Sequence, residues 1–153
     1  MSEASRDLPG SVLFACTMNA VRSPMAAAIL RHLAGRRLYV ASAGVRAGEP
    51  DPFVAIVMDE IGIDLSDHDP RTLADLDDTS FDLIVTLSPE AHHQALKLTR
   101  TMAVDVEYWP TFDPSMMQGQ GNRDQVLDSY RAVRDRLFER IKVRFPLTGG
   151  LSM

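Results

Sequence analysis

The segment Ser11–Ala15 most constrains the fold, because it is a short apolar run that leads directly into polar residues. Such a run is typical of a strand that is buried on both faces, as strands are inside a parallel sheet. Ser23 and Pro24 are the residue types favoured at the N-cap and first position of a helix, and Gly35 is the type that ends one. The segment therefore predicts a strand, a loop and a helix.

The same alternation of strand and helix continues to the end of the chain. Further strands are expected at 37–41, 81–87 and 104–108, and further helices at 53–61, 70–76, 89–100 and from 122 onward. Residues 109–121, rich in Pro, Gly, Gln and Met, are expected to form a functional loop. The pattern predicts an α/β fold: one domain over residues 1–153, with a four-stranded, parallel, doubly wound sheet and helices on both faces.

Composition narrows the class of protein. Sixteen basic and twenty-one acidic residues give a net charge of −5, which argues against a nucleic-acid partner. Residues 1–9 are expected to be a loose tail without a secretory layout, and no apolar stretch could cross a membrane, so a cytoplasmic location is expected. One cysteine excludes an internal disulfide and a multi-cysteine metal site. We expect no cofactor, no metal, and a monomer or weak dimer.

The basic residues of the last predicted helix crowd one region of the sequence. Such a group is usually a solvated face whose aliphatic stems lie along the protein surface. The residues are Arg131, Arg134, Arg136, Arg140, Lys142 and Arg144.

The loop from Cys16 to Arg22 carries the chemistry. It lies at the carboxyl end of the first predicted strand, where parallel sheets bind ligands. Its backbone N–H groups and the following helix N-terminus can converge on one point and bind a phosphate-like dianion. The same field stabilises a thiolate at Cys16, Arg22 can hold two oxygens of the anion, and Ser23 can donate a hydrogen bond to the sulfur. These elements predict nucleophilic attack on phosphorus.

The segment Val12–Met25 resembles the phosphate-binding loop of the low-molecular-weight protein tyrosine phosphatases. The resemblance extends over residues 11 to 114, and the final helix fits the same fold. Its other anchors are Ser42–Gly44, Gly62–Ser66, His68, Arg71, Leu73 and Asp113–Pro114.

The resemblance implies a metal-independent, two-step mechanism through a phosphocysteine. Cys16 would attack the phosphoryl group, and Asp113 would protonate the leaving oxygen and then activate water. Arg22 and the loop amides would hold the equatorial oxygens. In the family, the residue matching Asn19 keeps the loop's shape with help from those matching Ser42 and His68. The implied phosphate-binding set is Thr17, Met18, Asn19, Ala20, Val21, Arg22 and Ser23.

Three departures from the family pattern bear on function. Met18 stands where the family usually has glycine, which would strain the loop if that position needed a positive φ. Val21 replaces a frequent second cysteine, so no neighbouring thiol could trap oxidised Cys16. The segments 45–47 and 115–117 lack the aromatic residues that line the family's tyrosine slot, leaving methionines as a soft apolar wall.

These features leave three functions to compare. The leading hypothesis is a cysteine-dependent phosphatase acting on a phosphorylated protein or a small phosphomonoester, most plainly a protein tyrosine phosphatase. The alternative is a phosphate-sensing or anion-sensing module with little turnover, favoured by Met18 and the missing aromatic residues. Arsenate reduction ranks lower, because relatives with this loop pass electrons through further cysteines and this chain has none, so an external thiol would have to take their place.

Overall fold

Strand β1 (Ser11–Cys16) runs through the middle of a four-stranded sheet with the order β2-β1-β3-β4. The computed structural model describes residues 8–77 and 80–147, so most of the predicted tail at 1–9 lies outside the described residues. The other strands are β2 (Tyr39–Gly44), β3 (Leu83–Thr86) and β4 (Asp105–Tyr108). Every neighbouring pair is parallel. The predicted four-stranded parallel sheet is therefore confirmed.

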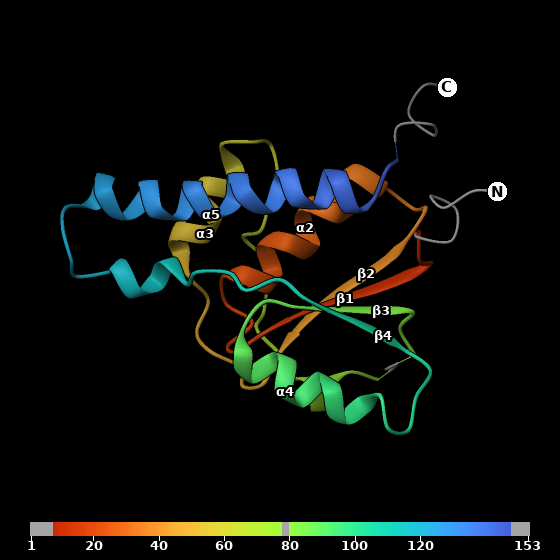
Figure 1. Cartoon of the computed structure of the whole chain (residues 1–153). Helices are drawn as coiled ribbons and strands as arrows, with labels where there is room; N and C mark the ends of the chain where they lie inside the picture. The colour runs from red at the N-terminus through yellow and green to blue at the C-terminus, as the bar shows by residue number, and fades with distance from the viewer. Residues whose placement is uncertain (1–7, 78–79, 148–153) are drawn as a thin grey trace.

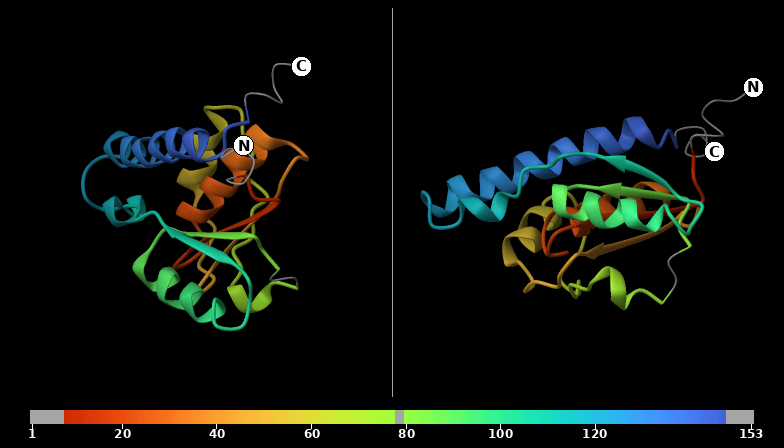
Figure 2. Two further views of the ribbon diagram at one scale, coloured as in Figure 1. Left: turned by 45° about the vertical axis from the view of Figure 1, so that its right-hand side comes forward. Right: turned by 60° about the horizontal axis from the view of Figure 1, so that its bottom comes forward.

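Helices cover both faces of this sheet (Figure 1). Helices α2 (Arg22–Ala34), α3 (Pro52–Asp59) and α5 (Arg123–Arg144) lie on one face. Helix α4 (Pro89–Leu98) and the short 3-10 helix η1 (Leu73–Asp75) lie on the other. Figure 2 shows the same layers from two further directions. No helix within the described ranges is long and apolar enough to cross a membrane.

The protein has two hydrophobic cores, one on each face of the sheet, because successive side chains of β1 point to opposite faces. Val12 and Phe14 belong to the larger core under α2 and α5, whereas Leu13 and Ala15 belong to the smaller core under α4. All four side chains are at most 1% exposed. This double burial is the reason why β1 has an apolar sequence without polar alternation.

The predicted second strand and the helix predicted at 70–76 differ most from the elements observed. The second strand begins later than predicted and extends through Ser42–Gly44, so that it pairs along the whole of β1 and reaches Cys16. The predicted helix at 70–76 is wrong, because only Leu73–Asp75 forms a short 3-10 turn. The backbone before it is extended instead: Gly44 N–H donates to the carbonyl of Arg71 at 2.9 Å, and Gly44 bridges to Thr72 as in a parallel sheet.

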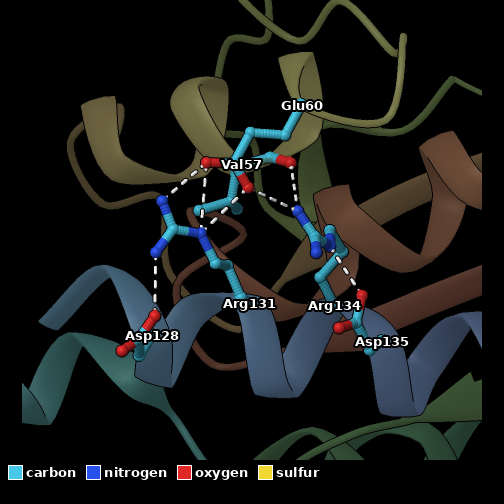
Figure 3. A network of polar contacts seen from close by, with 6 residues as sticks. All are labelled: Val57, Glu60, Asp128, Arg131, Arg134 and Asp135. Carbon is cyan, nitrogen blue, oxygen red and sulfur yellow. Dashed lines mark hydrogen bonds and ion pairs between the residues drawn. The ribbon is translucent and has the colours of Figure 1, made fainter. Parts of the chain in front are cut away.

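The sequence predicts that the basic residues of α5 form a solvated face, but not all of them do. Arg134 is only 8% exposed and donates to the carbonyl of Val57 at 2.7 Å and to Glu60 at 2.8 Å. Arg131 also reaches Glu60, with its nearest nitrogen at 2.7 Å (Figure 3). The prediction is therefore wrong for these two arginines, which connect α5 to the end of α3.

This network makes stability depend on pH. Hydrogen bonds from Arg131, joined by those from Arg134, lower the pKa of Glu60 from 4.5 to about 2 against the opposing effect of desolvation. A carboxylate whose pKa falls on folding stabilises the protein above its unfolded pKa, and that stability is lost as pH drops toward the folded value. Because Glu60 is 34% exposed, we expect solvent screening to reduce the effect to about 1 kcal/mol.

Urea unfolding at about pH 6 and about pH 3 measures this contribution, because the window lies across the titration of Glu60. Wild type is expected to lose about 1 kcal/mol more than Glu60→Gln over this range. Glu139→Gln is the matched control, since Glu139 is 73% exposed and its ion pair among the described residues is a 3.5 Å contact with Lys142. Equal pH dependence in wild type and Glu60→Gln would contradict the assignment.

Candidate active site

Cys16 lies at the carboxyl end of β1, where the sheet's connections turn to opposite sides. From β1 the chain passes first to β2 and later returns to β3 on the other side of β1. Such a switch point opens a crevice beyond the strand ends. The loop between β1 and α2 lies at this crevice, and Cys16 is 2% exposed at its floor. The structure thus places the predicted nucleophile where a doubly wound sheet binds its ligand.

A chain of buried polar contacts reaches the sulfur. The Sγ of Cys16 lies 2.9 Å from the Oγ of Ser23. Asn19 donates through its side-chain amide to the same Ser23 oxygen at 2.8 Å and to the Oγ of Ser42 at 3.0 Å. Because Ser23 accepts from Asn19, its own hydroxyl proton is available to the sulfur when Cys16 is a thiolate. The predicted contact between Ser23 and Cys16 is present.

The sequence predicts Ser23 as the N-cap of the helix, and this prediction is wrong. Helix α2 begins at Arg22, its N-cap position is Val21, and no side chain caps it. The hydroxyl of Ser23 contacts Cys16 and Asn19 instead. The free N-terminus of α2 consequently faces the loop, where an anion can satisfy its N–H groups.

Asn19 holds the shape of the loop. It is fully buried, and with φ of 52° it is the only non-glycine residue in the left-handed region among those described. Its side-chain oxygen accepts from the backbone N–H of Arg71 at 2.9 Å, and its carbonyl accepts from Nε2 of His68 at 2.8 Å. Asparagine tolerates this backbone conformation better than most residues do. The predicted grouping of Asn19, Ser42 and His68 is present in the structure.

His68 is positioned for a structural contact. Burial is the main cause that lowers its pKa, and the nearby Arg31 and Arg71 act in the same direction, against the hydrogen bond to Asn19. The ring is therefore favoured in its neutral form, with the proton on Nε2, since the carbonyl of Asn19 can only accept.

Met18 causes no backbone strain. The left-handed position of the loop belongs to Asn19, so Met18 needs no glycine-like φ. The close approach that requires a glycine occurs across from it, at Gly44. A Cβ there would lie 2.7 Å from the nitrogen of Asn19 and 2.9 Å from the carbonyl carbon of Met18. The conditional expectation of strain at Met18 is therefore not met.

Arg22 connects the loop to the segment that carries Asp113. Its side chain is mostly buried, and one guanidinium nitrogen donates to the carbonyl of Thr111 at 3.0 Å. Another lies 3.8 Å from Oδ2 of Asp113. The other carboxylate oxygen of Asp113 accepts from the backbone N–H and the hydroxyl of Ser115, at 3.0 and 2.7 Å. The structure thus brings Cys16, Arg22 and Asp113 to one cleft.

The cleft has a volume of about 300 Å³ and no aromatic side chain in its lining. Its floor and sides consist of Cys16, Met18, Ala20, Val21, Arg22, Gly48, Glu49, Pro50, Asp51, Pro52, Asp113, Ser115 and Gln118. Met116 and Met117 do not line it, and Met116 is 65% exposed, so they do not form the expected soft wall. The short 3-10 helix η2 (Pro114–Met117) directs Met116 outward.

The predicted oxyanion-binding residues divide into two groups. Met18, Ala20, Val21 and Arg22 line the cleft itself. The side chains of Thr17, Asn19 and Ser23 do not, because Thr17 donates to Ser88 at 3.0 Å and the other two support the loop from behind. The roles of all these residues in binding and catalysis stay predictions.

Several cleft residues were missed from the sequence. Asp51 followed by Pro52 has the pattern of an N-cap and first helical residue, and Asp51 does cap α3, so this signal was readable. Glu49 and Gln118 carry no local signal. Thr111 acts through its backbone carbonyl, which sequence cannot reveal. In the part of the chain that the structure describes, no group of three or more His, Cys, Asp or Glu side chains is arranged to hold a metal ion.

Comparison with known proteins adds two groups of relatives. The family model described as low molecular weight phosphotyrosine protein phosphatase matches residues 11–144. An arsenate reductase of Shouchella clausii is 34% identical over 140 residues, covering 90% of this chain and 96% of its own. A low molecular weight protein tyrosine phosphatase from T. tengcongensis superposes with a TM-score of 0.70 at 26% identity, covering 86% and 95%. The structure of an arsenate reductase in the phosphate binding state superposes with a TM-score of 0.68 at 25% sequence identity, covering 89% of this chain and 96% of its own.

These relatives correct the leading functional hypothesis. Proteins 31–34% identical over most of the chain are named arsenate reductase, so the prediction of a protein tyrosine phosphatase is wrong, as is the low rank of arsenate reduction. The error has a physical origin. Phosphate and arsenate are both tetrahedral oxyanions, so a loop that binds one presents the same amides, guanidinium and thiol to the other.

Proposed function

Because the chain belongs to the low molecular weight phosphotyrosine protein phosphatase family, we propose that it uses this family's cysteine loop to reduce arsenate with electrons from an external thiol. At the coarser level it is a cysteine-based, phosphatase-like enzyme. The observation that carries the finer proposal is the 34% identity to an arsenate reductase over 90% of the chain. The aromatic-free cleft above Cys16 supports it, since a small inorganic anion needs no ring-stacking wall.

The first step joins arsenic to sulfur. Arsenate occupies the loop with its oxygens on the backbone amides and on the guanidinium of Arg22. The thiolate of Cys16, stabilised by the hydroxyl of Ser23, attacks arsenic and forms an S–As bond. The As–O bond to one hydroxyl breaks, and that oxygen leaves as water after taking a proton from Asp113.

The second step transfers two electrons, and a single cysteine dictates how. Since no other cysteine exists in the sequence, the reductant is a separate thiol molecule. Its thiolate attacks the sulfur of Cys16, the S–As bond breaks, and the electron pair stays on arsenic, which leaves as arsenite. A second thiol then attacks the mixed disulfide and restores Cys16. In sum, one arsenate and two thiols yield one arsenite, one disulfide and one water.

Arsenite formation by the reduced protein tests the proposal. With arsenate and excess glutathione, or with a dithiol in its place, we expect one disulfide for each arsenite, and no turnover when thiol is omitted. Mass spectrometry of a quenched reaction should find the thiol attached to Cys16. If neither a monothiol nor a dithiol supports arsenite formation, even while an aryl phosphate is hydrolysed, the proposal fails.

The family's name refers to a phosphorylated substrate, which accords with a site for tetrahedral oxyanions. A monomer or weak dimer that binds no nucleic acid stays a prediction, as does a cytoplasmic location.

A further inference from the structure

The hydroxyl of Tyr130 joins two walls of the cleft. Tyr130 lies on α5 and is fully buried. Its hydroxyl donates to Oδ2 of Asp51 at 2.6 Å and accepts from the side-chain amide of Gln118 at 2.7 Å. Both partners line the cleft above Cys16, whereas Tyr130 does not. It therefore acts on the cleft only through them.

Each of the two partners lies at one end of a different helix: Asp51 at the start of α3, and Gln118 at the end of η2. Asp51 caps α3 through its other oxygen, which accepts from the backbone N–H of Phe53 at 2.9 Å. Gln118 follows η2, and its backbone N–H donates to the carbonyl of Ser115 at 3.1 Å. The opposite end of η2 is Asp113, the proton donor of the proposed reaction. The acid segment 113–118 is thus held by Arg22 at its start and by Tyr130 at its end.

The phenol is suited to hold both partners at once. Burial, followed by the hydrogen bond to Asp51, raises the pKa of Tyr130 far above its ordinary value. The hydroxyl therefore keeps its proton in the physiological range, donating it to the carboxylate while a lone pair accepts from the amide. Without this oxygen, Gln118 would reach Asp51 only by its 3.4 Å contact.

We propose that Tyr130 is a positioning residue, whose hydroxyl sets the distance between the acid segment 113–118 and the wall formed by Asp51. The proposal rests on the proposed function in one respect, the role of Asp113 as proton donor. Tyr130 touches no reacting atom, and its effect on the reaction passes through Gln118 to Asp113.

Tyr130→Phe tests the proposal, because it keeps the ring that packs 5.4 Å from Phe53 and removes only the hydroxyl. We expect kcat for arsenate reduction to fall about tenfold, since small displacements of a proton donor are costly. The KM for arsenate should change less than about twofold, because the hydrogen bonds of the Tyr130 hydroxyl within the described residues go to Asp51 and Gln118 rather than to the loop 16–22. A role confined to folding would not separate kcat from KM in this way.

A double-mutant comparison assigns the effect to Asp113. If Tyr130 acts by positioning this carboxyl, Tyr130→Phe should have little effect on kcat in an Asp113→Asn background. Tyr39→Phe is the matched control, since Tyr39 is 59% exposed on β2. An unchanged kcat in Tyr130→Phe, or a tenfold loss that persists without Asp113, would overturn the proposal.

Hydrogen–deuterium exchange provides a readout that needs no arsenate chemistry. Amides of residues 113–118 should exchange faster in Tyr130→Phe than in wild type or Tyr39→Phe, while those of the loop 16–22 should not. If wild type forms no arsenite but this difference appears, the proposed function fails and the positioning contact stands. If exchange at 113–118 is unchanged, the positioning contact fails whatever the reaction.

Discussion

Cys16→Ser is expected to lower arsenate reduction by about a thousandfold or more, to the background of the assay. The replacement exchanges a single atom, the sulfur that lies 2.9 Å from the hydroxyl of Ser23 in the wild-type protein. A serine hydroxyl is a far weaker nucleophile than a thiolate, and it cannot form the mixed disulfide through which electrons arrive. The measurement is arsenite formed with excess glutathione, for wild type and variant at equal concentration.

Retained anion binding is the control for this variant. Because the amides of the loop and Arg22 are untouched, Cys16→Ser should still bind inorganic phosphate, and calorimetry measures this directly. Its thermal midpoint should stay within a few degrees of the wild-type value. Thiol-dependent arsenite formation by the serine variant would refute Cys16 as the reacting group. Lost phosphate binding would show that the variant is misfolded at the loop and would require Cys16→Ala in its place.

Asn19→Ala is expected to destabilise the protein by about 3 kcal/mol and to lower activity by at least about a hundredfold. The change removes the partners of three groups: the hydroxyls of Ser23 and Ser42 and the backbone N–H of Arg71. It also places alanine at φ of 52°, where asparagine is tolerated better. Both effects act on the loop that holds the oxyanion. Urea unfolding and arsenite formation measure them separately.

Two further variants separate the causes. Asn19→Gly accepts the left-handed backbone but makes no side-chain hydrogen bonds, so it should recover about 1 kcal/mol of stability and little activity. Asn122→Ala is the matched control elsewhere. Asn122 caps α5, so its loss should cost about 1 kcal/mol and leave arsenite formation unchanged. If Asn19→Ala is no more harmful than Asn122→Ala, the loop does not depend on Asn19.

The predictable part of the fold came from signals that are local in the chain. The burial of both faces of β1 was readable from its apolar run. The first residues of α4 and α5 were readable from Ser88, Pro89 and Asn122. The failures involve side-chain hydrogen-bond partners that the residue pattern does not identify. The helix predicted at 70–76 is absent because the backbone N–H of Arg71, 52 residues from Asn19, bonds to that side chain. Ser23 does not act as a cap because its hydroxyl is engaged by the sulfur of Cys16 and by the side-chain amide of Asn19.

The reaction was harder to predict than the site. The spacing of Cys16 and Arg22 indicates a thiol beside an oxyanion, but it does not distinguish phosphorus from arsenic, since both oxyanions are tetrahedral. The missing aromatic residues were noted in the sequence, and the cleft has none. Their absence argued against a slot for a phosphotyrosine ring, but it did not indicate which other substrate the cleft binds. The relatives that are named arsenate reductase are what favours arsenic in the proposed reaction.

The sequence by itself determined the alternation of strand and helix, the place of the loop between Cys16 and Arg22 and the absence of a second thiol, because each depends on residue type or on neighbours within one turn of chain. The tertiary structure decided that Asn19, rather than Met18, takes the left-handed position. It also decided that Tyr130 joins the acid segment to Asp51. These features depend on which backbone and side-chain groups meet after the sheet has formed, and hydrogen bonds between segments far apart in the chain leave no periodic signal in it.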